Sequence, residues 1–105
     1  PDVGDVAWID FDPQAGHEQA KRRPAVVLTP KTYNEKTGLL ICVPLSTKIK
    51  GYPFEVSIKG AKESIALSDQ VKSLDWNARR AKYKTSISQN ELEEIKTKLA
   101  LLIGI

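Results

Sequence analysis

The apolar run Leu-Leu-Ile-Cys-Val-Pro-Leu at residues 39–45 decides the fold of this chain. An unbroken run of this kind is typical of a strand that is buried on both faces. Residues 24–28, Pro-Ala-Val-Val-Leu, form a second run of the same character. Two strands of this type have to be covered on both sides, and they therefore predict a compact β-structure with one core.

Shorter or alternating apolar segments predict further strands around these two runs. They lie at residues 4–11, 54–58, 65–67, 71–74 and 82–87. Pro13 ends the first of them, because proline cannot donate to a β-ladder. The segments 65–67 and 71–74 are either two short strands or one bent strand. Residues 31–38 predict a loop or a single helical turn that Gly38 stops.

The last part of the chain predicts the clearest helix. Ser88 and Glu91 have the S-x-x-E spacing of a capping box, in which both side chains satisfy free amide groups at the helix start. Gly104 provides a stop, and apolar residues recur between them at helical spacing, at Leu92, Ile95, Leu99, Leu102 and Ile103. Short strands followed by one amphipathic helix predict a mainly β fold class, a compact barrel with a C-terminal helix packed on it.

The composition bounds the size and the chemistry of the protein. Its 105 residues, 41% hydrophobic and 28% charged, predict one globular domain over residues 1–105. The formal net charge of +3 permits a nucleic-acid partner without demonstrating one. One Cys and one His exclude an internal disulfide, a multi-thiolate zinc site and a His-rich metal site. No apolar run approaches the ~20 residues of a membrane span and no secretory signal leads the chain, so we expect a cytoplasmic protein.

A long polar segment separates the first strand from the run at 24–28. Residues 14–23, Gln-Ala-Gly-His-Glu-Gln-Ala-Lys-Arg-Arg, hold the only histidine, His17, next to Glu18. Hairpin loops commonly have about 2–5 residues, and longer loops on a rigid scaffold often carry function. The alternative interpretation is a solvated surface loop.

This segment contains the groups that phosphodiester cleavage without a metal requires. The 2′-hydroxyl of RNA has to lose a proton, which His17 or Glu18 can accept. Negative charge then develops on the phosphorus oxygens, and the Arg23 guanidinium can hold them with two parallel hydrogen bonds. Arg23 directly precedes a buried strand, so we expect it to be held more firmly than Lys21 or Arg22, which we assign to the loop.

Two hydroxyl residues, Ser46 and Thr47, follow the run at 39–45. Hydroxyls at a strand end are usually caps or turn residues. If this strand lies beside the strand of Arg23, however, both strand ends meet in one pocket. Ser46 then donates to a phosphate oxygen or orients the attacking group.

Basic residues gather after the hydroxyl pair, at Lys48 and Lys50, and again in Arg-Arg-Ala-Lys-Tyr-Lys at 79–84. They predict a track for a nucleic-acid backbone, with Tyr83 available to stack on a base. A solvated charged face is the alternative. Asp10 and Asp12 lack a third ligand at a defined spacing, and we expect neither a metal nor another cofactor.

Motifs spread over the whole chain resemble those of the MazF/PemK toxins. The match includes the spacing between motifs, and Lys-Gly-Tyr-Pro-Phe-Glu-Val makes the chain most similar to the MazF branch. The motifs are Gly-Asp-Val at 4–6, Asp-Phe-Asp-Pro at 10–13, Gly-His-Glu-Gln at 16–19, Arg-Pro-Ala-Val-Val-Leu at 23–28, Tyr-Asn at 33–34, Cys-Val-Pro-Leu-Ser-Thr at 42–47, Lys-Gly-Tyr-Pro-Phe-Glu-Val at 50–56 and Asp-Gln-Val-Lys-Ser at 69–73.

The resemblance implies a fold, an activity and partners. The fold is a small SH3-like barrel of the PemK/CcdB type. The activity is a sequence-specific, metal-independent endoribonuclease that cuts single-stranded mRNA and leaves 2′,3′-cyclic phosphate and 5′-hydroxyl ends. The partners are a second copy of the chain in a homodimer and an acidic antitoxin of the MazE/PemI kind, within a type II toxin–antitoxin system. No membrane is implied.

The same resemblance implies the site residues. The key arginine of the family falls on Arg23, its key threonine on Ser46, and the Glu of its Glu-Gln pair on Glu18. The functional His of the PemK/Kid branch falls on His17, and these four residues are expected to be catalytic. The residues expected to bind RNA are Gln19, Thr47, Lys48, Lys50, Asp69, Gln70, Lys72 and Arg79.

Three departures from the family pattern affect these expectations. Ser46 keeps the hydroxyl of threonine and loses the methyl group that restricts its rotamer, and we expect activity to survive. Lys21 stands where the Glu-Gln-x-Gly turn of the family has glycine, so the loop is expected to bend differently. Leu67 stands where the PemK/Kid branch has an arginine paired with its aspartate, so Asp69 is expected to contact RNA or to be structural.

The sequence is compatible with two other functions. A toxin that poisons DNA gyrase, as the related CcdB toxins do, has the same barrel and dimer and no need of the Arg23 and Ser46 pair. A nucleic-acid-binding barrel without chemistry needs only the basic residues, and its binding is sensitive to salt. For the antitoxin, we expect an extended acidic segment with apolar residues that covers Arg23.

Overall fold

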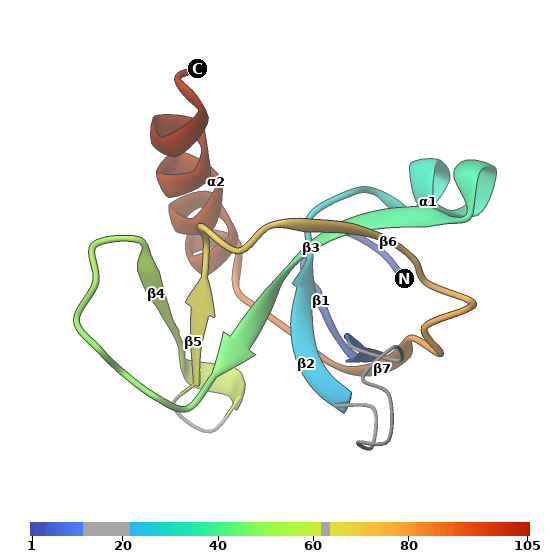
Figure 1. Cartoon of the computed structure of the whole chain (residues 1–105), viewed down its shortest axis with the longest axis horizontal. Coiled ribbons are helices and arrows are strands. Elements are labelled where there is room, and N and C mark those ends of the chain that lie inside the picture. Colours follow the sequence, from blue (N-terminus) through green and yellow to red (C-terminus); the bar gives the residue numbers. More distant parts are fainter. Residues whose placement is uncertain (12–21, 62–63) are drawn as a thin grey trace.

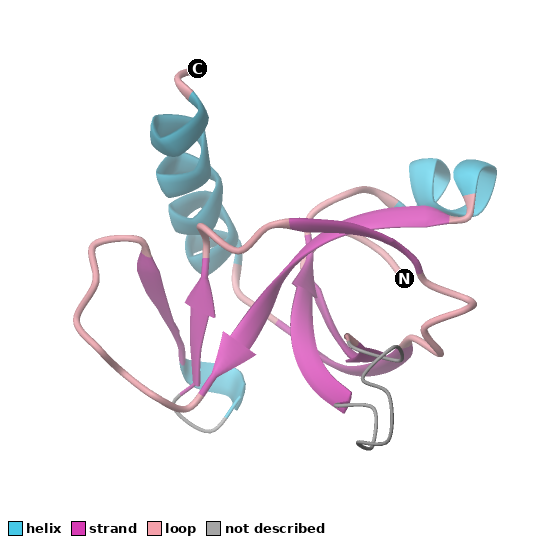
Figure 2. Cartoon of the chain, in the orientation of Figure 1, coloured by secondary structure: helices cyan, strands magenta, loops and turns pink. Residues whose placement is uncertain are grey.

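The computed structural model describes residues 1–11, 22–61 and 64–105, which form one bent antiparallel sheet and two α-helices (Figures 1 and 2). The mainly β fold class with a C-terminal helix is confirmed. The strands are β1 (Asp5–Asp10), β2 (Arg22–Val27), β3 (Leu39–Ser46), β4 (Glu55–Ile58), β5 (Ser64–Leu67), β6 (Lys72–Asp75) and β7 (Lys82–Ser86). The helices are α1 (Lys31–Thr37), the 3-10 helix η1 (Lys59–Ala61) and α2 (Gln89–Ile103).

Strand β3 organises the sheet because it pairs with three other strands. The order is β4-β5-β3-β2-β1-β7, and β6 pairs with β3 outside this path. The first half of β3 pairs with β6 and its last residues pair with β5, while β2 runs along its other edge. Figure 1 shows β3 crossing the molecule between these partners, so that the sheet curves into a half-barrel.

Both faces of the central strands are buried, as the unbroken apolar runs predict. On one face, β1–β3 pack with β4, β5 and α2 in a cluster of Val6, Val26, Val43, Leu45, Val56, Ile58, Ala66 and Ile95. On the other face, a second cluster contains Ala7, Ile9, Ala25, Val27, Leu40, Cys42 and Leu74, with Phe11 and Trp76 packed against it. A strand that is covered on both sides has no polar face, which explains why residues 24–28 and 39–45 do not alternate.

Helix α2 begins as its sequence predicts. The Ser88 side chain accepts a hydrogen bond from the Glu91 amide, the Glu91 carboxylate accepts one from the Ser88 amide, and Gly104 ends the helix in a left-handed conformation. Only the first half of the helix is buried, through Leu92 and Ile95. The apolar residues of its end are exposed, with Leu102 at 52% and Ile103 at 62%.

The structure decides between two pairs of alternatives and differs from the predicted elements at two further points. The segments 65–67 and 71–74 correspond to two strands, and residues 31–37 form a short helix that Gly38 ends. The 3-10 helix η1 was not predicted. Arg22 belongs to β2 and not to the loop, because it pairs with Asp10 across the β1–β2 ladder. Among the described residues, no helix is long and apolar enough to cross a membrane.

Candidate active site

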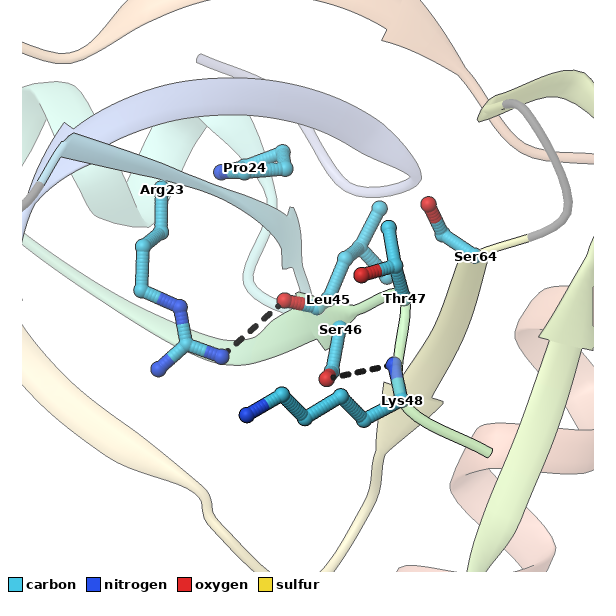
Figure 3. A pocket seen from close by; sticks show the side chains of 7 residues that line it. All are labelled: Arg23, Pro24, Leu45, Ser46, Thr47, Lys48 and Ser64. Carbon is cyan, nitrogen blue, oxygen red and sulfur yellow. Dashed lines mark hydrogen bonds between the residues drawn. The ribbon is translucent and has the colours of Figure 1, made fainter. Parts of the chain in front are cut away.

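A pocket of about 390 Å³ opens where β2 begins and β3 ends. The strands pair with Ala25 opposite Pro44, and the same register continued by two residues brings Arg23 opposite Ser46. The two strand ends therefore meet as expected, although the residues lie far apart in the chain. The pocket is lined by Arg23, Pro24, Leu45, Ser46, Thr47, Lys48 and Ser64 (Figure 3).

The polar groups of this pocket are suited to an anion. Arg23 donates through Nη2 to the Leu45 carbonyl at 3.1 Å, and this bond holds its guanidinium beside the end of β3. Ser46 Oγ accepts a hydrogen bond from the Lys48 amide at 3.1 Å, which leaves its own hydrogen to be donated. In Figure 3 the Lys48 side chain extends back beneath Ser46 toward Arg23. Two cations and a hydroxyl donor around one cavity favour a phosphate group.

Arg23 has no acidic partner among the described residues, whereas its neighbour Arg22 forms an ion pair with Asp10 at 2.9 Å. The Arg23 guanidinium lies 6.0 Å from the centre of the Phe11 ring, a cation–π distance. Its charge is therefore held in place by a backbone carbonyl and an aromatic ring, neither of which neutralises it. A cation in this state is available to a bound anion.

A second hollow of about 150 Å³ adjoins the first through Ser46 and Lys48, which line both. It brings together three of the residues expected to bind RNA, Lys50, Asp69 and Gln70. The other residues that line it are Tyr52, Phe54, Glu55 and Leu67. Thr47 and Lys48 lie in the first pocket, so five of the eight expected RNA contacts surround one continuous concave surface.

The sequence interpretation missed two residues of the second hollow, Tyr52 and Phe54, whose rings lie 5.4 Å apart. Their signal was present in the motif at 50–56, which contributed to the family resemblance and was given no role of its own. Glu55 of the same motif supports the loop, because its carboxylate accepts hydrogen bonds from the amides of Lys50 at 3.2 Å and Gly51 at 3.0 Å.

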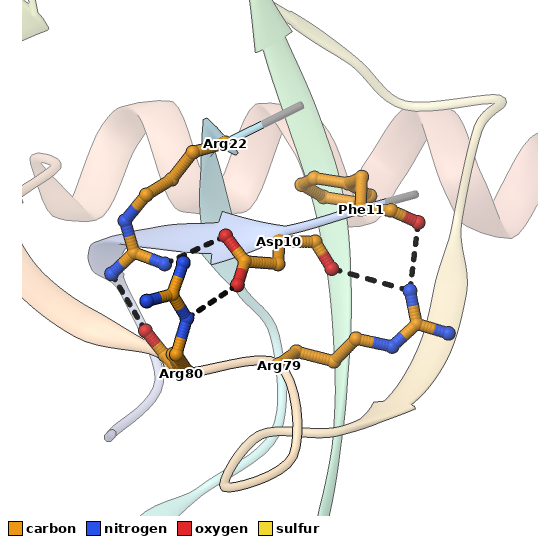
Figure 4. Close-up of polar contacts among 5 residues, drawn as sticks. All are labelled: Asp10, Phe11, Arg22, Arg79 and Arg80. Carbon is orange, nitrogen blue, oxygen red and sulfur yellow. Dashed lines mark hydrogen bonds and ion pairs between the residues drawn. The ribbon is translucent and has the colours of Figure 1, made fainter. Parts of the chain in front are cut away.

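Lys72 and Arg79 are placed around Phe11 and do not line the two hollows. The Lys72 ammonium lies 5.9 Å from the centre of the Phe11 ring, the same ring that Arg23 approaches. Arg79 donates through Nη1 to the carbonyls of Phe11 at 2.7 Å and Asp10 at 3.2 Å (Figure 4). The Arg79 guanidinium is thus engaged by the backbone at the end of β1.

The expected proton acceptors and one RNA contact, His17, Glu18 and Gln19, lie outside the described residues, as do Asp12 and Lys21. Within the described ranges, no group of three or more His, Cys, Asp or Glu residues is arranged to hold a metal ion. The thiol of Cys42 is fully buried, and this burial raises its pKa to about 12. Cys42 therefore belongs to the core and not to the site.

Comparisons with known proteins agree with one another. The family described as PemK-like, MazF-like toxin of type II toxin-antitoxin system matches residues 2–103. The chain is 54% identical over 105 residues to the endoribonuclease toxin MazF of Escherichia coli K12, covering 99% of this chain and 95% of that protein. It is 27% identical over 106 residues to the endoribonuclease PemK of Escherichia coli, covering 95% of this chain and 80% of that protein. Its structure matches MazF in a crystal structure of MazE-MazF from Deinococcus radiodurans with a TM-score of 0.93 and 44% identity, covering 100% of this chain and 96% of that one.

Proposed function

The chain belongs to the PemK-like, MazF-like toxins of type II toxin–antitoxin systems and is an endoribonuclease toxin, and on this premise we propose that it cuts single-stranded RNA without a metal ion. We further propose that the products carry 2′,3′-cyclic phosphate and 5′-hydroxyl ends. The observation that carries the proposal is the meeting of Arg23 and Ser46 in one pocket, with Arg23 free of any ion pair among the described residues. The relatives are named as endoribonucleases, which favours this function over gyrase poisoning.

In the proposed reaction, the 2′-oxygen of RNA attacks the neighbouring phosphorus and the bond from phosphorus to the 5′-oxygen breaks. His17 or Glu18 removes the proton of the 2′-hydroxyl, and the leaving 5′-oxygen takes up a proton from water, so that one proton is removed from the RNA and one is returned to it. Arg23 holds the non-bridging oxygens, on which negative charge increases. Ser46 donates its hydroxyl hydrogen to one of these oxygens, because its oxygen accepts a hydrogen bond from the Lys48 amide and its hydrogen remains to be donated.

The second hollow supports a path for the RNA strand beside the scissile phosphate. Lys50 and Lys48 provide backbone contacts, and Asp69 and Gln70 provide acceptors and donors for base edges. Such contacts select a short sequence in single-stranded RNA, because unstacked bases expose their edges. We also propose that the enzyme acts on mRNA in the cytoplasm.

We also propose the two protein partners. A second copy of the chain covers the exposed apolar end of α2. At this end, Leu102 lines one hollow together with Pro53 and Phe54. Ile103 lines another hollow together with Leu28 and Ile41. An acidic antitoxin segment covers Arg23 and the lysines beside it, because opposite charges favour this contact. The solved structures similar to this chain include MazE-MazF complexes, which supports an antitoxin partner.

The function is tested by adding the purified chain to a pool of single-stranded RNA in the presence of EDTA and sequencing the ends. We expect cuts within a short preferred sequence, with 5′-hydroxyl and cyclic phosphate ends. Arg23→Ala should lower the rate by about 100-fold or more, as expected when a preorganised charge that stabilises the transition state is removed. Lys36→Ala removes the same charge from exposed α1 and should cut like the wild type.

Three results would contradict the proposal. Uncut RNA in every sequence context would exclude the nuclease, and a parallel gyrase supercoiling assay would then test the alternative. Normal cleavage by Arg23→Ala would exclude the assigned role of Arg23. Cleavage that stops in EDTA and returns with a divalent ion would exclude the metal-free reaction. An acidic antitoxin segment at saturation should block RNA binding by the wild type.

A further inference from the structure

The end of β1, the start of β2 and the turn before β7 are joined around one carboxylate, that of Asp10 (Figure 4). Asp10 is only 6% exposed, and each of its carboxylate oxygens binds a different arginine. Oδ1 accepts from Arg22 Nη1 at 2.9 Å, and Oδ2 accepts from Arg80 Nε at 2.7 Å. Asp10 therefore links residues that are 12 and 70 positions away from it in the chain.

Backbone bonds close this network. Arg22 Nη2 donates to the Arg80 carbonyl at 2.7 Å, so its guanidinium bridges Asp10 and the turn. The Asp10 amide donates to the Arg79 carbonyl at 3.0 Å, and the Arg79 guanidinium donates back to the carbonyls of Asp10 and Phe11. The two strand ends are thus clamped by one turn, residues 76–80.

The backbone of Arg80 indicates how firmly the turn is held. Its φ is +52°, the only positive φ of a non-glycine residue in the described part of the chain. This left-handed conformation is unfavourable for a residue with a Cβ, because the Cβ lies too close to the following carbonyl oxygen. Three contacts of Arg80 stabilise it in this conformation. Its guanidinium pairs with Asp10, its carbonyl accepts a hydrogen bond from Arg22, and its amide donates one to the Asn77 carbonyl.

We propose that Asp10 is a positioning residue for RNA cleavage, which holds Arg22 so that Arg23 presents its guanidinium to the phosphate beside Ser46. The inference rests on the proposed function. In this role Asp10 acts through Arg22 and the backbone of β2, and not by direct contact with RNA. Successive residues of a strand point to opposite faces, so fixing the Arg22 side chain toward Asp10 directs Arg23 to the other face.

The pairing also determines which arginines remain available to RNA. One carboxylate binds two guanidinium groups, those of Arg22 and Arg80. Under this proposal, the pairing holds both guanidinium groups back from a bound phosphate. Arg23 pairs through its backbone with Ile9, the residue before Asp10, and its guanidinium lies over Phe11, the residue after Asp10. Without Asp10, two more cations near the site are free to bind the strand in unproductive positions.

The test compares Asp10→Asn with Asp5→Asn, a matched control at the other end of β1 that removes the same charge. Asn at position 10 has the size of Asp but turns an N–H donor toward a guanidinium, which breaks one of the two pairs. We expect kcat to fall by about 10-fold to 100-fold, because a displacement on the order of 1 Å can lower a rate by that larger factor. Asp5→Asn should keep the wild-type kcat.

KM distinguishes positioning from a loss of folded protein. Asp10→Asn frees an arginine, so KM for RNA should fall and the slope of log(1/KM) against log salt should steepen by about 0.7 for each arginine released. A variant that is merely less folded would lose activity with an unchanged KM and slope. Arg22→Gln should lower kcat as Asp10→Asn does, and the double variant should be no slower than either single variant.

A readout without RNA separates this inference from the proposed function. In the chain labelled with 15N-arginine, the Nε–H signal of Arg23, identified by its absence in Arg23→Ala, should shift in Asp10→Asn and stay in place in Asp5→Asn. An unchanged Arg23 signal would overturn the inference even if the wild type cuts no RNA. An unchanged kcat in Asp10→Asn, or effects of the Asp10 and Arg22 substitutions that multiply, would also overturn it.

Discussion

Arg22 and Arg23 are adjacent and chemically identical, but the strand places them in opposite surroundings. Arg22 lies across the ladder from Asp10 and forms an ion pair with it. Arg23 bonds to the Leu45 carbonyl and lies over Phe11, and it keeps its charge free of an acidic partner among the described residues. The alternation of a β-strand thus gives one arginine a structural role and leaves the other for the proposed chemistry.

Ser46 tests the proposed chemistry at the level of a single hydroxyl. Ser46→Ala removes the donor beside Arg23, and we expect cleavage to slow by about tenfold or more, since hydrogen bonds to charged groups contribute about 1.5–3 kcal/mol. Ser46→Thr keeps the donor, adds a methyl group and should stay within a few-fold of the wild type. Ser57→Ala, at the exposed position of β4, is the matched control for a lost hydroxyl. Equal rates for Ser46→Ala and the wild type would show that the hydroxyl is not used.

Among the elements, α1 shows how a short helix is held without a cap of its own. Its N-terminal Pro30 makes no side-chain bond, but Asn34 is fully buried and connects four segments. The side-chain nitrogen of Asn34 donates to the backbone carbonyls of Pro1 and Thr29, and its side-chain oxygen accepts a hydrogen bond from the Thr29 hydroxyl. The backbone carbonyl of Asn34 accepts a hydrogen bond from Trp76 Nε1. The Tyr-Asn pair of the family motif is therefore explained by packing, through Asn34.

The N-terminus of α2 shows how a cap can tie two elements together. Glu91 completes the capping box with Ser88 and also accepts a hydrogen bond from the Lys59 amide of η1 at 2.9 Å. Burial alone raises the pKa of the Glu91 carboxyl, but the amides of Ser88 and Lys59 outweigh it and leave the pKa below its ordinary value. The charged form of Glu91 therefore stabilises the folded chain.

The cap gives a prediction for stability and its pH dependence. Ser88→Ala should lower the free energy of unfolding by about 1 kcal/mol, the usual effect of losing a serine cap.

Because the pKa of Glu91 is lowered on folding, the contribution of its charge to the free energy of unfolding is present above the unfolded pKa of about 4.3 and is lost as the pH falls below it. Denaturant unfolding of Glu91→Gln should therefore depend less on pH between about 5 and 3 than that of the wild type.

Glu93→Gln is the control for this comparison, because Glu93 is exposed on the same helix and pairs only with the neighbouring Gln89 and Lys96 among the described residues. Its unfolding should keep the wild-type dependence on pH. Parallel pH curves for Glu91→Gln and the wild type would show that the cap charge contributes nothing to folding.

At the scale of the whole molecule, the sheet is filled on both faces but α2 is only half covered. Leu92 and Ile95 pack on the core, whereas Leu101 is 76% and Ile105 87% exposed. An apolar helix end of this kind is costly in water and marks an interaction surface. The proposed homodimer would remove this surface from water and enlarge the core that one small chain can build.

The homodimer is tested with Leu102→Glu, which places a charge in the apolar hollow that Leu102 forms with Pro53 and Phe54. Sedimentation of the wild type should give twice the 11.7 kDa mass of one chain, and the variant should give the mass of one chain. Tyr33→Glu adds the same charge to an exposed residue of α1 and should leave the dimer intact. A wild type that sediments as a single chain at high concentration would exclude the dimer, and a dimeric Leu102→Glu would place the interface elsewhere.

Much of the fold follows from local patterns. The two unbroken apolar runs predicted the central strands, and the capping box predicted the start of α2 to the residue. A pocket between the hydroxyls after one run and the arginine before the other was expected on the condition that the two strands lie side by side. The placement of Arg22 in the loop was wrong, because the polar character of the segment concealed its pairing with Asp10.

The sequence by itself determined the strands, the capped helix and the family, because alternation, helical spacing and motif order are properties of neighbouring residues. Only the tertiary structure decided which cations stay free for RNA. Asp10 and Arg80 are 70 residues apart, and no local pattern relates them. Their ion pair exists because the antiparallel register brings the end of β1, the start of β2 and the turn before β7 together. Charge alone therefore does not identify the site, since folding pairs Arg22 and Arg80 with Asp10 and leaves Arg23 beside Ser46.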